Sequence, residues 1–257
     1  MGFPGEGNTG VPSGTALSAY TGPSTISTPN TAIVGKTLGC IRVTAPGVVI
    51  RNSRISCGGS VAIASFDGDY SGAALLIEDS EIECQNRAGS HGIGDANVTA
   101  RRVNIHSCEN GLDVNQNVVV EDSYIHDLYN GGGSHLDGIQ LAGHWTGSGF
   151  AQGAVNVTVR HNTIYGVGPG GSFGTSAIIS NSGGDTNILI EGNLLAGGAY
   201  TLYCEQGTKG VNYRVLNNRF STRFGPKVGY YGPSTDCSDE TQSGNVYHET
   251  GMPLSLG

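Results

Sequence analysis

Histidines and aromatic residues gather in the middle of the chain, where they could exchange protons with a ligand and also bind it. Four of the seven histidines, His126, His135, His144 and His161, lie in or beside two long insertions, and the only tryptophan, Trp145, lies among them. A neutral imidazole accepts a proton near pH 7, and an indole ring on a glycine-rich loop offers a flat apolar surface. We therefore place the candidate chemistry here, with His135 as the first candidate base.

Carboxylates and amides of neighbouring strands are predicted to face the same ligand. When GLDVNQ (111–116), DGIQLAG (137–143) and TLYCEQ (201–206) are aligned by their apolar residues, every second residue points outward. One outward row contains Asp113, Gln140 and Tyr203, and the next contains Asn115 and Glu205. Such a strip suits a linear glycan, whose hydroxyl groups bond to polar side chains while its ring faces stack on aromatic rings. The predicted substrate-binding residues are Gln140, Asn115, His144, Trp145, Tyr165, Tyr203 and Glu205.

The composition restricts the elements that can hold these residues. Glycine makes up 43 of the 257 residues and is spread throughout the chain, which excludes helical bundles because each glycine costs a helix interior about 1 kcal/mol relative to alanine. No apolar run approaches the ~20 residues of a membrane helix. A net charge of -8 with three lysines argues against binding to nucleic acid or an anionic membrane. The remaining class is a soluble, turn-rich β protein.

An eight-residue strand motif recurs along the chain and predicts stacked parallel strands. Its form is apolar-x-apolar-charged-polar-Ser/Asn-x-Ile, as in VVIRNSRI from Val48 and VVVEDSYI from Val118, and successive copies start 20 to 39 residues apart. A fixed strand motif with a variable period is typical of a parallel β-helix, because insertions enter the turns without disturbing the stack.

Two positions of the motif predict side-chain ladders between neighbouring strands. The fourth position alternates in charge, and we expect an ion ladder on the outer face, since parallel strands lie about 4.8 Å apart. Its members are Arg51, Glu78, Arg101, Glu121, Arg160 and Glu191. The sixth position is mostly Ser or Asn, which we expect to hydrogen-bond the turns above and below at an inward bend. Its members are Ser53, Ser80, Val103, Ser123, Asn162, Asn193 and Asn218.

These strands resemble those of the pectate-lyase-like superfamily of right-handed parallel β-helices. There, a first-sheet strand of the form Asp-Gly-Ile leads to a second-sheet strand of the form Val-x-Ile-x-x-Asn and then to a short third-sheet strand. The resemblance covers about residues 40–232 and implies an all-β, single-domain, right-handed parallel β-helix of about seven to eight coils with capped ends. We expect an N-terminal arm and cap over 1–38, the β-helix over 39–232 and a C-terminal cap over 233–257.

Lyases of this superfamily cleave uronate polymers by β-elimination, and the resemblance implies that activity here. In the calcium-dependent members, carboxylates at the start of first-sheet strands hold the metal and an Arg or Lys is the base. Asp113 and Asp137 match the carboxylates and make Ca²⁺ the candidate cofactor, whereas no arginine or lysine nearby matches the base. A histidine or tyrosine base therefore fits better. The candidates for it are His135, His126, Tyr129 and Tyr165.

Six cysteines without a CxxC pair predict disulfides and an oxidising compartment. Several of them follow third-sheet strands of successive coils, so neighbours could bridge. One consistent pairing is Cys40–Cys57, Cys84–Cys108 and Cys204–Cys237, although six cysteines allow 15 connectivities. Met1 is followed by Gly and Pro instead of a basic and then apolar segment, so we interpret the chain as the mature form of a secreted, extracellular, monomeric protein.

Three functions remain open for this arrangement. The first is a polysaccharide lyase acting on a uronate-containing glycan. The second is a glycoside hydrolase that uses Asp113 and Asp137 as its carboxylate pair, which requires a separation of about 5–9.5 Å. The third is a non-catalytic protein that binds a glycan with the same loops. In all three the partner is a polysaccharide, not nucleic acid or a membrane.

Overall fold

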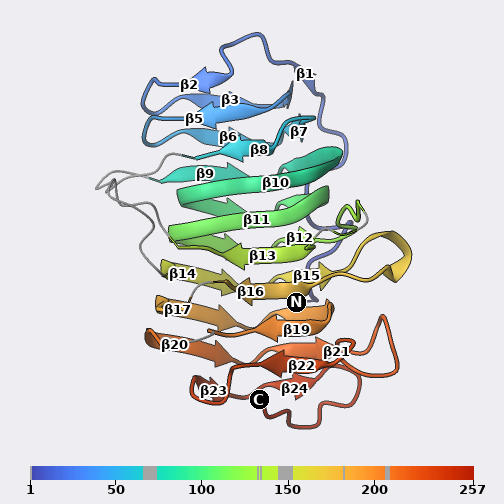
Figure 1. The fold of residues 1–257 in the computed structure, drawn as a ribbon. Helices are drawn as coiled ribbons and strands as arrows, with labels where there is room; N and C mark the ends of the chain where they lie inside the picture. Colours follow the sequence, from blue (N-terminus) through green and yellow to red (C-terminus); the bar gives the residue numbers. More distant parts are fainter. Residues whose placement is uncertain are drawn as a thin grey trace.

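The strands of this protein stack in three parallel ladders (Figure 1). The computed structural model describes residues 2–65, 74–131, 133, 135–143, 153–181, 183–205 and 209–257. Through most of the stack, strands three apart in the chain pair with each other, as β13 does with β16 and β16 with β19. The long strands β10 (Glu81–Arg101) and β11 (Asn104–Glu121) each pass through all three ladders. This topology is all-β and is compatible with the predicted parallel β-helix.

We name the ladders after the predicted sheets. Besides the middle parts of β10 and β11, the first sheet contains β2 (Thr25–Ile26), β5 (Ile41–Val43), β8 (Val61–Ala64), β13 (Asp137–Leu141), β16 (Ser176–Ser180), β19 (Tyr200–Tyr203) and β22 (Gly232–Thr235). The second sheet contains the C-terminal parts of β10 and β11, together with β3 (Ala32–Val34), β6 (Val49–Arg51), β9 (Leu75–Glu78), β14 (Val155–Arg160), β17 (Thr186–Glu191), β20 (Val211–Leu216) and β23 (Thr241–Ser243). The third sheet contains the N-terminal parts of β10 and β11, together with β1 (Ser18–Ala19), β4 (Lys36–Leu38), β7 (Arg54–Ser56), β12 (Tyr124–Ile125), β15 (Thr163–Gly166), β18 (Leu194–Gly197), β21 (Arg219–Ser221) and β24 (Val246–Tyr247).

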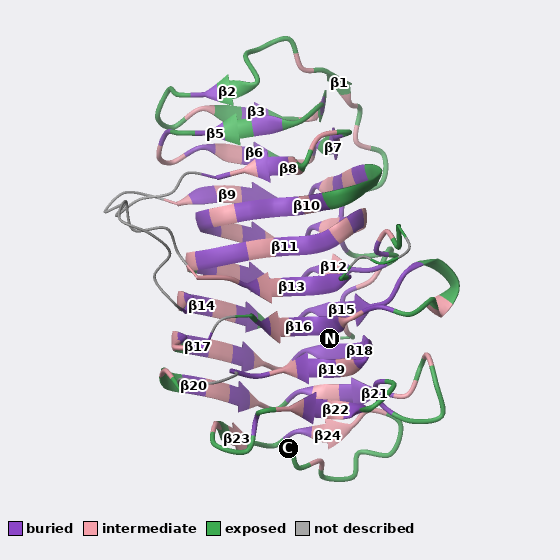
Figure 2. Cartoon of the chain, viewed as in Figure 1, coloured by how far each residue is buried: buried purple, intermediate pink, exposed green. Residues whose placement is uncertain are grey.

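The core is a continuous column of branched apolar side chains between the three sheets. Alternate residues of each strand point into it, as Val118 and Val120 do in β11, and both are fully buried. Figure 2 shows this burial along the stacked strands. A short 3₁₀ helix, η1 (Pro169–Gly171), lies in the loop after β15. In the part of the chain that the structure describes, no helix has the length and apolarity needed to cross a membrane.

The ladders extend beyond the boundaries predicted for the caps. Strands β1 to β4 lie within the predicted N-terminal segment 1–38, and β23 and β24 lie within the predicted C-terminal segment 233–257. They pair in register with the strands of the stack, as β3 does with β6 and β21 with β24. These segments therefore add strands to both ends of the stack.

Residues 2–15 form an arm that runs along the outside of the stack. The Gly10 N–H donates a hydrogen bond of 2.9 Å to the carbonyl of Arg102. The Phe3 ring stacks on His161 at 5.9 Å and meets the edge of His248 at 6.0 Å. Pro4 and Thr9 are buried in this position. The arm thus contacts β-strand ends that lie far apart along the stack.

The fifth position of the repeat forms the bend between the second and third sheets. Its seven residues have positive φ angles of 49° to 65°, a left-handed conformation that favours Gly, Asn and Asp. They are Asn52, Asp79, Arg102, Asp122, His161, Gly192 and Asn217. His161 also bonds through Nδ1 to Asp122 at 2.6 Å. His161 therefore belongs to this bend.

The predicted polar ladder at the next position is present and buried. Backbone N–H groups bond to the side chain one strand further along, as from Ser53 to Ser80 (3.1 Å) and from Asn162 to Asn193 (2.9 Å). The apolar side chain of Val103 interrupts this pattern after Ser80. The amide ladder of Asn162, Asn193, Asn218 and Asn245 continues to the last repeat. Its members also donate to carbonyls of the second sheet, as Asn193 Nδ2 does to Val159 at 2.9 Å. This ladder satisfies buried backbone groups at the bend.

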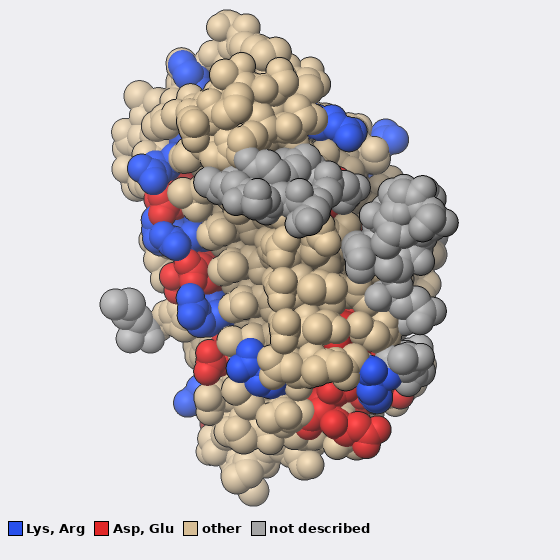
Figure 3. All heavy atoms as spheres, turned by 90° about the vertical axis from the view of Figure 1, so that its left-hand side faces the viewer, with Lys and Arg blue, Asp and Glu red and all other residues tan. Residues whose placement is uncertain are grey.

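The predicted ion ladder is confirmed on the outer face of the second sheet (Figure 3). Arg51 Nη2 lies 2.7 Å from Glu78, and Glu121 receives Arg101 Nε and Arg160 Nη2 at 2.6 Å each. Glu191 is in register with Arg160. Burial raises the pKa of Glu121, but the hydrogen bonds from Arg160 and Arg101 outweigh it and hold that pKa below its ordinary value of 4.5.

We expect Glu121→Gln to lower the free energy of unfolding by about 1 kcal/mol at neutral pH, a modest value because both arginines are partly exposed. A carboxylate whose pKa is lower in the folded than in the unfolded protein stabilises the fold at pH values above its unfolded-state pKa. This contribution is lost as the pH falls through the folded-state pKa. The difference between variant and wild type should therefore disappear in acid. Urea unfolding at about pH 7 and at about pH 3 measures it; an equal difference at both pH values would contradict this role.

Of the 15 connectivities that the sequence leaves open, the structure has the one named above as consistent with the strand order. Cys40 bonds to Cys57, Cys84 to Cys108 and Cys204 to Cys237. No cysteine is left unpaired. Three disulfides indicate an extracellular or otherwise oxidising environment.

Candidate functional site

The outward face of the first sheet carries the predicted polar row. The strand register pairs Asp113 with Gln140, Gln140 with Ile179, and Ile179 with Tyr203. The predicted alignment of Asp113, Gln140 and Tyr203 is therefore confirmed, with an apolar residue inserted between the last two. All four side chains are half-buried. The row crosses four successive strands and gives a ligand a continuous surface.

A second row, closer to the start of these strands, supports Asp137. Asn110 is in register with Asp137, and Asp137 with Ser176. Asn110 Oδ1 accepts the Asp137 N–H at 3.1 Å, while its Nδ2 donates to Gln140 Oε1 at 3.1 Å. Ser176 Oγ donates to Asp137 Oδ1 at 2.5 Å. Asn110 thus links the two rows. Because it bonds to Gln140 Oε1, the Nε2 hydrogens of Gln140 point away from Asn110 and can serve as donors.

Burial changes the acidity of both carboxyl groups on this face. Asp137 is only 1% exposed, and burial raises its pKa to about 6, against the hydrogen bond from Ser176 and the nearby charge of His135. The charge of Asp113 raises the Asp137 pKa further. Burial also raises the pKa of Asp113, opposed by His91. The two carboxyls therefore exchange protons closer to neutral pH than ordinary aspartates do.

Asp137→Asn is expected to stabilise the protein at neutral pH. When the pKa of a carboxyl is higher in the folded than in the unfolded protein, the free energy of unfolding decreases as the pH rises from the unfolded-state pKa to the folded-state pKa. A rise from 3.8 to about 6 corresponds to at most about 3 kcal/mol. The variant should be more stable than wild type above about pH 6 and equal to it below about pH 4. Denaturant unfolding across this range tests the prediction, which parallel pH profiles of the two proteins would contradict.

His91 also belongs to this face and is not among the site residues predicted from the sequence. Its Nε2 lies 3.7 Å from Asp113 Oδ2, and its Nδ1 is buried without a hydrogen-bond partner among the described residues. His91 is in register with Asn110 and so begins the row that continues to Asp137 and Ser176. Extending the alignment to HGIGDA (91–96) would have placed it. The face therefore presents one His–Asp pair, His91 with Asp113, and a further histidine, His135, whose charge acts on Asp137.

His135 and Tyr129 lie in the loop that leads into β13. His135 is exposed, two residues before Asp137, and its charge acts on that carboxyl. Tyr129 is half-buried near the start of the loop, and its N–H donates to the Cys108 carbonyl at 2.7 Å. The structure thus places Asp113, Asp137 and Gln140 on one sheet, with His135 in the loop that leads into it.

His126 and Tyr165 belong to the third sheet and lie away from this row. His126 stacks on Tyr124 at 3.9 Å and bonds to Asp127 at 2.7 Å and Asn104 at 2.9 Å. Tyr165 is buried in β15, with its ring edge-on to Tyr124 at 5.7 Å. Both follow the bend that separates the second and third sheets, so their side chains leave the stack on a different side. The geometry does not support them as bases for a ligand on the first sheet.

Two other candidates are buried and two cannot be placed. Glu205 is fully buried, and it accepts hydrogen bonds from the N–H groups of Asp185 and Gly210. It therefore closes the turn between β19 and β20, and the prediction that it binds substrate is not supported. Asn115 is 8% exposed. His144 and Trp145 lie outside the described residues.

A chain of aromatic rings continues the polar row toward the loops. Tyr203 meets Tyr200 at 5.4 Å, Tyr200 meets Tyr231 at 5.7 Å, and Tyr231 meets Tyr230 at 4.9 Å. Tyr230 then meets Phe173 at 6.1 Å. The last three rings are 57% to 64% exposed. We call these five rings the aromatic strip; it gives the face a stacking surface that the sequence analysis had sought at Trp145.

The predicted calcium site does not fit the described residues. No three His, Cys, Asp or Glu side chains in the described ranges come together in a way that could hold a metal ion. Asp113 and Asp137 offer carboxylates from two strands, but Ca²⁺ takes six to eight oxygen ligands. Asp137 is also buried and engaged with Ser176. We therefore derive no step from a metal.

Fold and site together define an all-β protein of stacked parallel strands with an acidic, His-flanked face on one sheet. Comparison with known proteins adds no closer assignment. No family model matches the chain, and neither a curated protein nor a solved structure matches it.

Proposed function

We propose that this protein is a secreted polysaccharide lyase that cleaves a uronate-containing glycan by β-elimination on the first sheet. The observation that carries the proposal is the His91–Asp113 pair beside the buried Asp137, on which the charge of the nearby His135 acts. An imidazole beside a carboxylate is a base available near neutral pH, and the carboxylate stabilises the imidazolium that forms. The resemblance to right-handed pectate-lyase-like β-helices is in keeping with this activity. We also propose that the protein is a monomer with about seven to eight coils.

Each step of the reaction can be assigned to a residue of this face. His135 takes the proton from carbon 5 of the uronate, and the electrons of that C–H bond form the double bond to carbon 4. The bond from carbon 4 to the glycosidic oxygen breaks at the same time. Asp113, whose pKa burial raises, acts in its protonated form as the acid that protonates the departing oxygen. The Gln140 amide donates to the uronate carboxylate and stabilises the charge that develops there.

A glycoside hydrolase is the second candidate, favoured by one observation. A carboxyl with a pKa of about 6, as in Asp137, is suited to act as the general acid of a glycosidase. Hydrolysis, however, requires both carboxyls to reach the scissile bond or its water, and Asp137 is 1% exposed. An Asp137 that orients His135 needs no such access. The burial of Asp137 therefore favours the lyase.

One experiment separates the lyase, the hydrolase and a binding protein. The protein is incubated with a panel of uronate and neutral polysaccharides, and the ultraviolet absorbance of unsaturated uronate is followed together with new reducing ends. Both signals indicate a lyase, whereas reducing ends alone indicate a hydrolase. Glycan binding without either signal would reject both enzyme proposals.

A further inference from the structure

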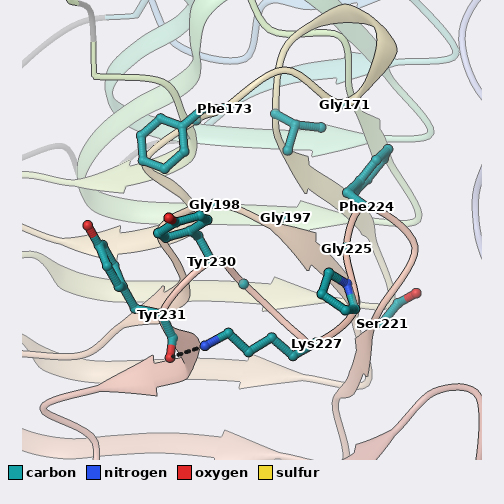
Figure 4. A pocket seen from close by; sticks show the side chains of 14 residues that line it. Gly171, Phe173, Gly197, Gly198, Ser221, Phe224, Gly225, Lys227, Tyr230 and Tyr231 are labelled. Atoms are coloured by element: carbon teal, nitrogen blue, oxygen red, sulfur yellow. Dashed lines mark hydrogen bonds between the residues drawn. The ribbon is translucent and has the colours of Figure 1, made fainter.

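A pocket of about 610 Å³ lies beside the aromatic strip, outside the candidate catalytic face. Three successive loops form it, each connecting the third sheet to the first: residues 167–175, 198–199 and 222–231. Figure 4 shows Phe173, Tyr230 and Tyr231 on one side of the opening and Phe224 on the other. The volume lies within the range of small-molecule sites.

Glycine residues shape the pocket between these rings. A side chain at Gly197 would collide with Val167, and one at Gly171, where φ is +78°, would meet Phe224 at 3.0 Å. Tyr230 and Tyr231 leave 64% and 61% of their surface exposed. Large rings that stay exposed around a hollow are typical of a ligand-binding surface, because their faces can still bury apolar area. Tyrosines add hydroxyl groups that can bond to a polar ligand.

The pocket has one charged lining residue, a lysine, although the whole protein is acidic. Lys227 is its single charged lining residue, and no carboxylate pairs with it among the described residues. Its Nζ lies 3.4 Å from the Tyr231 carbonyl, so the ammonium sits beside the aromatic rings (Figure 4). Arg223, four residues earlier, lies over the Phe224 ring at 5.6 Å. The ion ladder, by contrast, has its arginines paired with glutamates.

We infer that this pocket binds an acidic sugar unit, with the ring face against Tyr230 and Phe173 and the carboxylate or sulfate group on Lys227. The inference rests on the proposed function in that the unit belongs to the same glycan, which the aromatic strip would guide from Tyr203 to the pocket. Rings that combine apolar faces with a nearby ammonium match an acidic pyranose. The pocket thus holds a negative charge of the substrate at a distance from Asp113 and Asp137, whose carboxylates would repel it.

Binding of defined oligosaccharides tests this inference. Calorimetric titrations would use oligogalacturonate, oligomannuronate and a sulfated galactan oligosaccharide, each against its carboxyl-reduced or desulfated counterpart. The full-length His135→Ala variant would be the titrated protein, so that a probe is not consumed. We expect at least one acidic probe to bind about tenfold more tightly than its neutral counterpart, as one charge-assisted hydrogen bond would produce. The probe that shows this preference identifies carboxylate or sulfate as the acidic group.

Two substitutions assign the preference to the pocket. Lys227→Met should abolish it, whereas Lys36→Met, which removes the same charge from β4 at the other end of the stack, should leave it unchanged. Tyr230→Ala should weaken binding of acidic and neutral probes alike, by about tenfold. Equal binding of acidic and neutral probes, or a preference that survives Lys227→Met, would overturn the inference. Turnover of saturating glycan by the wild-type protein tests the proposed function separately, because none of the catalytic steps assigned above uses Lys227.

Discussion

Replacing His135 by alanine is expected to lower the turnover number for uronate glycan by about 10²–10⁴-fold, the usual contribution of a general base. The residue is exposed, two residues before Asp137, and its charge acts on that carboxyl. Its loss removes the group that accepts the proton while leaving the core, the disulfides and both ladders intact. The free energy of unfolding should therefore change by less than about 0.5 kcal/mol. Initial rates from unsaturated-uronate absorbance and urea unfolding measure the two effects.

Two further measurements separate a catalytic from a structural role of His135. Added imidazole should restore part of the activity of His135→Ala, because a small base can occupy the vacated space. His248→Ala, which removes an imidazole just after the last third-sheet strand, should keep wild-type turnover. The catalytic assignment would be wrong if His135→Ala kept full turnover, or if it lost stability and activity together.

Replacing Asn193 by leucine is expected to reduce the free energy of unfolding by about 3–5 kcal/mol, since each buried polar group left without a partner costs about 1–3 kcal/mol. Asn193 is fully buried in the amide ladder. It accepts the Asn162 N–H at 2.9 Å and donates to the Val159 carbonyl at 2.9 Å and to Asn218 Oδ1 at 3.0 Å. Leucine has a similar volume but satisfies none of these groups. The midpoint of urea unfolding should fall while its slope stays constant.

Asn187→Gly is the matched control for this variant. Asn187 also belongs to a row of paired amides, with Asn156 and Asn212 at 3.1 and 3.0 Å, but it is exposed. Glycine keeps its left-handed backbone, where φ is 57°. This variant should lose less than about 1 kcal/mol, because water replaces the missing partners. Similar losses in the two variants would show that burial does not decide the importance of an amide ladder here.

Most of the fold could be predicted from the sequence because stacking repeats the same constraint many times. The charged fourth position, the left-handed fifth position and the buried Ser or Asn at the sixth position each recur in successive strands, so chance agreement is improbable. The ion ladder from Arg51 to Arg160 and the amide ladder around Asn193 follow from this repetition alone. The strands of the end segments were missed because β1, β2 and β24 are two residues long and carry no complete motif.

The candidate site could be predicted only where it follows the same periodicity. Asp113, Gln140 and Tyr203 lie in strands that align, so their common row could be found from spacing. His126 and Tyr165 were grouped with them because they are close in sequence, yet the bend after the second sheet sends them to another side. The buried position of Glu205 depends on contacts between turns. The pocket depends on three loops that meet only when the coils stack, and no local pattern around Lys227 indicates this.

The N-terminal arm has a consequence for how the protein unfolds. Stacked repeats contact only their neighbours, so such proteins can lose structure piecemeal from an end. Here Gly10 is bonded to Arg102, while Phe3 lies against His161 and His248. Coils that never touch one another therefore share a single connecting segment. Fraying of the last coil would remove the contact of Phe3 with His248 and weaken the hold of the arm on the rest of the stack. The loss of structure is therefore more cooperative than nearest-neighbour stacking alone would make it.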